Sequence, residues 1–99
     1  MTRNPDRCPM HPGELLREDV IPATKKTKSE IARMLGISRQ HLHDVLAERK
    51  PVSPEVAVRL GKLLGNAPLF WIRLQGNYDA WHAAREVDVS AVPTLHAAA

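Results

Sequence analysis

Four polar residues between positions 39 and 44 have side chains of the types that recognise the edges of DNA bases. They are Arg39, Gln40, His43 and Asp44. A guanidinium group can donate two hydrogen bonds to guanine, an amide can pair with adenine at two points, and a carboxylate can accept from cytosine. We expect Arg39 and Gln40 to read bases and His43 and Asp44 to modify that reading. The alternative for Arg39 is a surface salt bridge with Asp44.

A second set of residues could bind the phosphate groups beside those bases. Positive charge is concentrated in this part of the chain: residues 25–50 contain seven Lys and Arg against three acidic residues, whereas residues 51–99 contain four of each. Such a local excess indicates a surface for nucleic acid, although a merely solvated helical face is the alternative. Free N–H groups at a helix start also attract anions. The candidate phosphate ligands are Lys28, Ser29, Ser38, His41, Arg49 and Lys50.

Two short helices joined by a tight turn must position these side chains. Apolar or small residues recur with helical spacing on both sides of Gly36, a residue type that readily takes the left-handed conformation ending a helix. Ser38 can cap the second helix, which we call the recognition helix. Ala32 is small enough to lie where two helices cross at a steep angle. Together these features of residues 28–49 are typical of a helix-turn-helix unit.

Local start and stop signals predict five helices and therefore an all-α fold. We expect one compact domain over residues 11–86, with a flexible arm before it (1–10) and a loose tail after it (87–99). The last helix should run from Pro68 to about Glu86. The other signals are a start near His11 and Pro12, a stop at Pro22, a capping box of Thr27 and Glu30, a cap at Ser53 before Pro54, and an end at Gly65.

The aromatic residues are confined to the last predicted helix. Trp71, Leu74, Tyr78 and Trp81 are spaced three, four and three residues apart and so share one face. Phe70 lies off this stripe, which makes the helix apolar on more than one side. Because Trp and Tyr are enriched in interfaces, we expect these residues to form a homodimer that presents two recognition helices to major grooves roughly 34 Å apart. The alternative is that every aromatic side chain belongs to the core.

Other classes of function have little support in the sequence. His41 and His43 are two residues apart and point to different sides of a helix, and the acidic residues of the first helix have no partner base. We therefore expect no catalytic residue, no metal and no cofactor. No apolar run is long enough to cross a membrane, the N-terminus lacks the apolar core of a secretory signal, and Cys8 is the single cysteine. These features fit a cytoplasmic protein.

Four segments of the chain resemble the HigA antitoxins, small phage-repressor-like (XRE class, VapI-type) helix-turn-helix proteins. The segments are HPGELLRE (11–18), the helix-turn-helix (28–49), SPEVAVRLGKLLGN (53–66) and FWIRLQGNYDAW (70–81). The resemblance implies a five-helix dimer that binds the operator of its own toxin–antitoxin operon. It also implies a partner toxin similar to HigB, an mRNA-cleaving nuclease that the protein would neutralise.

In the family's DNA-binding pattern, the motif positions fall on Ser38, Arg39, Gln40, His43, Asp44 and Arg49. This chain departs from many relatives in having His41 and His43 in place of small hydroxyl residues, and Ala47-Glu48 in place of an Asn-Gly turn. The histidines could take over the phosphate contacts of those hydroxyls. Two other functions remain open: a stand-alone repressor without a toxin, and an interaction module that has lost DNA binding.

Overall fold

Helices make up all the regular structure of residues 7–96, the part of the chain that the computed structural model describes, and no strand occurs in this range. An unbroken helical run comprises α1 (Pro12–Leu15), the π-helical η1 (Leu16–Val20) and α2 (Ile21–Thr24). It is followed by α3 (Lys28–Leu35), α4 (Arg39–Leu46), α5 (Pro54–Leu64) and α6 (Pro68–Glu86). Counting the first run as one helix, the predicted five-helix, all-α fold is confirmed.

Pro22 does not end the first helix, so the predicted stop at this residue is wrong. Proline has no N–H, and in a regular α-helix its ring clashes with the carbonyl four residues earlier. The preceding turn widens into η1, and the N–H of Ile21 donates to the carbonyl of Leu16, five residues back. The helix ends at Lys25 instead, where the backbone turns left-handed (φ 58°). The wider turn thus lets the chain carry the proline inside a helix.

The predicted caps around the helix-turn-helix are present. Thr27 and Glu30 form the capping box: the Glu30 N–H donates to Thr27 Oγ1 (3.1 Å), and the Thr27 N–H donates to Glu30 Oε1 (3.2 Å). Gly36 ends α3 with a φ of 74°, and Ser38 Oγ accepts from the N–H of His41 at 3.0 Å. These local interactions fix where α3 ends and α4 begins, and so set the angle between the two helices.

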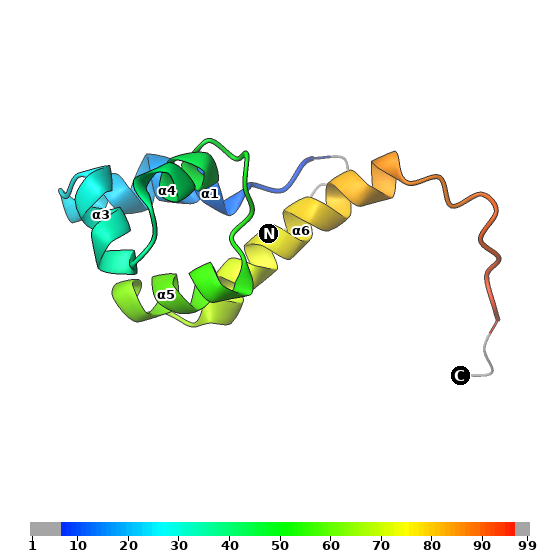
Figure 1. The fold of residues 1–99 in the computed structure, drawn as a ribbon. Helices are drawn as coiled ribbons and strands as arrows, with labels where there is room; N and C mark the ends of the chain where they lie inside the picture. The colour runs from blue at the N-terminus through cyan, green and yellow to red at the C-terminus, as the bar shows by residue number, and fades with distance from the viewer. Residues whose placement is uncertain (1–6, 97–99) are drawn as a thin grey trace.

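One hydrophobic core joins the helices. Ala32 is fully buried, as expected for a small residue at a helix crossing. In Figure 1, α1, α3, α4 and α5 gather at one end of the molecule, while the second half of α6 and the tail after it extend away. The buried apolar side chains are Leu16, Ile21, Ile31, Ala32, Leu35, Leu42, Val45, Leu46, Val52, Val56, Ala57, Leu60 and Trp71.

The aromatic stripe of α6 faces the body of its own chain along much of its length. Trp71 is 1% exposed, and its Nε1 donates to Asn66 Oδ1 at 3.0 Å. Its predicted place in a dimer interface is therefore wrong, because a ring buried among its own helices cannot contact a second copy. Leu74 also packs against the core, and the ring of Tyr78 lies 4.8 Å from that of His11, measured between centroids. Phe70, in contrast, is exposed.

The ends of the chain lie partly outside the described range. Of the predicted arm, residues 7–10 precede the first helix without regular structure, and Cys8 Sγ lies 3.5 Å from His82 Nε2 on α6. The last helix begins at Pro68 and ends at Glu86, as predicted, and residues 87–96 after it are exposed. The predictions for residues 1–6 and 97–99 fall on parts of the chain outside the described residues.

Candidate nucleic-acid interface

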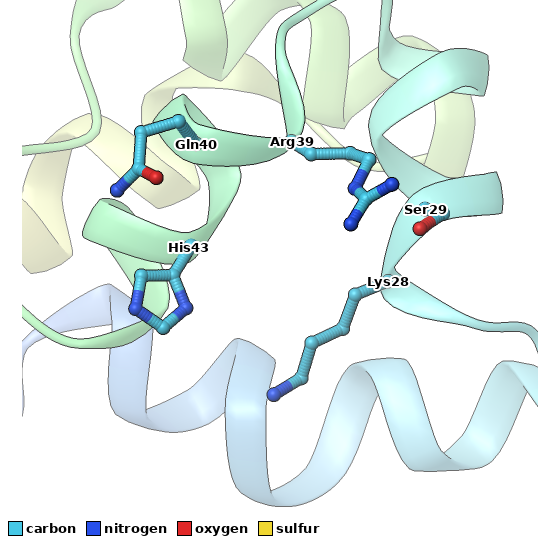
Figure 2. A pocket seen from close by; sticks show the side chains of 5 residues that line it. All are labelled: Lys28, Ser29, Arg39, Gln40 and His43. Carbon is cyan, nitrogen blue, oxygen red and sulfur yellow. The ribbon is translucent and has the colours of Figure 1, made fainter.

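The start of α3 and the outer face of α4 enclose an open hollow of about 440 Å³. Figure 2 shows the Arg39 side chain extending from the start of α4 towards Ser29 and Lys28 on α3, with Gln40 and His43 projecting from α4. The fold thus brings three predicted base-reading residues beside two residues that are predicted to bind phosphate.

Burial of one side of α4 determines which residues face outwards. Leu42, Val45 and Leu46 point into the core, each no more than 2% exposed. Arg39, Gln40 and His43 are exposed on the rest of the helix, and His41 is half-buried. Arg39 forms no salt bridge with any residue of the 7–96 range, and the alternative pair with Asp44 is absent there.

Asp44 is the centre of a polar network on α4. Its Oδ1 accepts from Gln40 Nε2 (3.0 Å) and from Nε and Nη2 of Arg49 (3.3 and 3.1 Å), and its Oδ2 lies 3.8 Å from Lys50 Nζ. Partial burial alone would raise the pKa of this carboxyl, but hydrogen bonds from Arg49 and Gln40 outweigh that effect and hold the pKa below its ordinary value. Asp44 is therefore charged, and both its oxygens lie beside donors of its own chain.

The remaining residues predicted to bind DNA phosphates lie at both ends of α4. Ser38 is the N-cap, so its hydroxyl already accepts one backbone hydrogen bond. Arg49 and Lys50 follow the C-terminal end of α4, where both lie close to Asp44. The structure therefore groups Lys28 and Ser29 with the start of α4 and holds Arg49 and Lys50 at its opposite end.

Two arginines outside the helix-turn-helix hold the ends of its helices, and the sequence did not reveal them. Arg17 Nη1 donates to the carbonyl of Leu46, the last residue of α4, at 2.6 Å. Arg59 Nη1 donates to the carbonyl of Leu35, the last residue of α3, at 2.9 Å. The last carbonyls of a helix have no partner within it, so each guanidinium satisfies a group that the helix leaves open. Arg17 also pairs with Glu48 Oε2 at 3.2 Å.

Gln75 fixes the loop that follows α4. It is 6% exposed; its Oε1 accepts from the N–H of Val52 (2.8 Å), and its Nε2 donates to Asp79 Oδ1 (3.0 Å). The only signal in the sequence was an amide and a carboxylate four residues apart on a largely apolar helix. The interaction anchors the basic loop of Arg49 and Lys50 to α6.

The HPGE segment of the first helix has a structural explanation. His11 is 3% exposed and caps α1, since its Nδ1 accepts from the Gly13 N–H at 2.9 Å. Burial lowers the pKa of His11 below its ordinary value, despite an opposing effect of Glu48. Gly13 has no room for a side chain, because a Cβ there would clash with the carbonyl oxygen of Val45 on α4. The segment sets the first helix directly against α4.

Within residues 7–96, no three histidine, cysteine or acidic side chains gather as metal ligands would. No helix in this range is both long and apolar enough to span a lipid bilayer.

A profile of the helix-turn-helix family matches residues 21–72, which is more than half of the chain and includes the whole of the hollow. The chain belongs to the helix-turn-helix family. The matched residues end at Ile72, so the profile covers α2 to α5 and only the first part of α6.

Solved structures and curated relatives agree with this assignment. Antitoxin GraA in complex with its operator has a TM-score of 0.84 at 33% identity, over 98% of this chain and 100% of that one. An addiction module antidote protein of the HigA family from Coxiella burnetii has a TM-score of 0.81 at 28% identity, over 91% and 100% of the two chains. Antitoxin HigA-1 of Vibrio cholerae is 29% identical over 79 residues, 80% of this chain and 74% of that protein. The predicted resemblance of this helix-turn-helix protein to HigA-type antitoxins is confirmed.

Proposed function

We propose that this helix-turn-helix protein binds double-stranded operator DNA through α4. The observation that carries the proposal is the hollow between α3 and α4, where Arg39, Gln40 and His43 lie next to Lys28 and Ser29. In this class of protein the N-terminal residues of the recognition helix contact base edges in the major groove. Arg39 and Gln40 occupy that part of α4, and its opposite face is buried. A structure of GraA with its operator supports the same assignment.

The first test is a fluorescence-anisotropy titration with DNA from upstream of the protein's own gene, at two salt concentrations. We expect salt-dependent binding that Arg39→Ala weakens by about 1–3 kcal/mol, the value of a two-point contact with guanine. Lys62→Ala removes one positive charge from an exposed position on α5, away from the hollow and from α6, and should change the affinity little. Binding no tighter than to random-sequence DNA would contradict the proposal.

We infer further that the protein is a cytoplasmic, non-enzymatic antitoxin that represses its own operon and neutralises a HigB-like mRNA-cleaving toxin. The similarity to antitoxin HigA-1 and to the HigA-family antidote protein supports this inference. The test is co-expression with the small protein encoded beside its gene. We expect that protein alone to arrest growth, and this chain to restore growth and to copurify with it. A neighbour that neither arrests growth nor copurifies would leave the stand-alone repressor as the function.

We also propose a homodimer formed through α6. Phe70, Leu69 and Ile72 are all more than a third exposed on the first half of this helix. The second half projects from the body (Figure 1) and carries Trp81, which is half-buried. Exposed apolar residues on a projecting helix support association with a second copy. Of the interface predicted from the sequence, Phe70, Leu74, Tyr78 and Trp81 remain candidates.

A further inference from the structure

Asp44 and Gln40 lie one turn apart on the outward face of α4 and are joined by a hydrogen bond of 3.0 Å. The carboxylate can only accept hydrogen bonds, so the amide group of Gln40 must turn its nitrogen, not its oxygen, towards Asp44. The other amide N–H and the carbonyl oxygen of Gln40 stay available. This donor and acceptor pair matches N7 and the N6 amino group of adenine.

The position of Asp44 makes it a poor base reader itself. Its side chain is 15% exposed, and its two oxygens face Gln40, Arg49 and Lys50. A DNA base would have to displace these protein donors before it could reach the carboxylate of Asp44. The same contacts hold Arg49 and Lys50 beside the helix and neutralise part of their positive charge, which lowers their attraction for the phosphates of any DNA sequence.

We propose that Asp44 is a positioning residue that makes Gln40 select adenine and restrains non-specific binding by Arg49 and Lys50. The proposal rests on the proposed function of α4 as the DNA-reading helix. The sequence led us to expect that Asp44 modifies base reading. Its contacts now assign that effect to the neighbouring side chains of Gln40, Arg49 and Lys50 and not to a contact with cytosine.

The experiment is selection of binding sites from a pool of randomised double-stranded DNA by the full chain and its variants. The wild type should enrich a site in which each half-site has an adenine that Gln40→Ala no longer requires. Asp44→Asn keeps the shape of the side chain but can donate as well as accept, so the amide of Gln40 can adopt either orientation. Asp44→Asn and Asp44→Ala should therefore lose about fivefold or more of the preference for that adenine, the lower end of a two-point contact, while preferences elsewhere in the site remain.

Affinity for random-sequence DNA gives a second readout. It should rise in both Asp44 variants, with a steeper dependence on salt, because Arg49 and Lys50 are released from the carboxylate. Asp19→Ala is the matched control: it removes the same charge from an exposed position in a separate groove between η1 and α6, and should leave the selected site unchanged. The double variant Gln40→Ala/Asp44→Ala should lose no more adenine preference than Gln40→Ala alone.

The outcomes separate this inference from the proposed function. If the wild type enriches no sequence, the proposed function fails and the inference with it. If the wild type enriches a site and Asp44→Asn selects the same bases with the same preference, only the inference is overturned. A Gln40-dependent position occupied by a base other than adenine also overturns it. Circular dichroism of each variant confirms that a changed selection comes from a folded protein.

Discussion

Gly13 lies where the first helix meets α4, and there is no space there for a side chain. A Cβ would clash with the carbonyl oxygen of Val45 and lie 3.0 Å from Nδ1 of His11. The carbonyl of Val45 accepts from the N–H of Glu48 at 3.0 Å, so moving it aside would disrupt the turn that ends α4. At the residue scale, the absence of a Cβ at Gly13 therefore allows the first helix and the recognition helix to pack closely at this point.

Gly13→Ala should lower the free energy of unfolding by about 1–3 kcal/mol, the usual cost of overpacking a core. Gly76→Ala is the matched control: no atom lies within 4 Å of the new methyl group, and alanine favours a helix interior, so this variant should gain about 0.5–1 kcal/mol. Urea unfolding followed by the fluorescence of Trp71 and Trp81 measures both. Equal unfolding midpoints for the two variants would show that α4 leaves enough space at position 13 for an alanine side chain.

His11 should make stability depend on pH. Burial lowers its pKa in the folded chain, whereas the unfolded chain has the ordinary histidine value of about 6.5. The unfolded state then binds the proton more readily. The free energy of unfolding should be highest above pH 6.5, fall as the pH drops below that value, and level off below the folded pKa.

His11→Asn tests this dependence by unfolding measurements between pH 8 and pH 5. Asparagine can still accept from the Gly13 N–H at the helix start but does not titrate, so the loss between these pH values should shrink. His96→Asn, an exposed change in the tail, should keep the loss of the wild type. If His11→Asn and the wild type lose equal stability, the histidine cap does not cause the effect.

Local signals predicted the elements well, and interactions between distant residues were not predictable. The capping box of Thr27 and Glu30 depends on residues three apart, so the sequence contains the whole interaction. The same is true of Ser38 and Gly36 around the turn. The predicted helix end at Pro22 was wrong because the rule against proline within a helix assumes regular α-helical geometry, whereas η1 before this proline is a π-helix. Arg17 contacts Leu46 across 29 residues, and no local pattern predicts that pairing.

Gln75→Leu should destabilise the packing of α6 against the loop after α4. Leucine is similar in size but leaves the N–H of Val52 buried without an acceptor, at a cost of about 1–3 kcal/mol. Asn77→Leu places the same side chain on an exposed position of α6 and should cost little. Urea unfolding compares them. Hydrogen exchange at the Val52 amide should be faster in Gln75→Leu, and unchanged exchange would contradict the assigned bond.

At the scale of the molecule, the described chain is elongated, 51 Å by 29 Å by 25 Å, because α6 and the tail after it continue beyond the body (Figure 1). The sequence located the apolar helix but could not divide its sides between core and interface. Trp71 and Phe70 are neighbours in sequence but differ in burial: Trp71 is 1% exposed, whereas Phe70 is 43% exposed. Only packing with α5 and the first helix decides between them.

Ile72→Asp should weaken the proposed dimer, because it places a charge within the exposed apolar residues of α6. Sedimentation equilibrium should show a shift from dimer to monomer, and DNA affinity should fall because each half-site would be bound singly. Val58→Asp is the control, since Val58 is also exposed but lies on α5. A wild type that sediments as a monomer at all concentrations would exclude the dimer.

The two arginine contacts determine whether the DNA-reading segment could be transferred to another protein by itself. The carbonyl ends of α3 and α4 are held by Arg59 and Arg17, and neither residue lies between positions 28 and 49. A graft of that segment onto another scaffold would leave both helix ends without these donors. A chimera that keeps the DNA preference of this chain should therefore also receive an arginine from each flanking helix, one in the place of Arg17 and one in the place of Arg59.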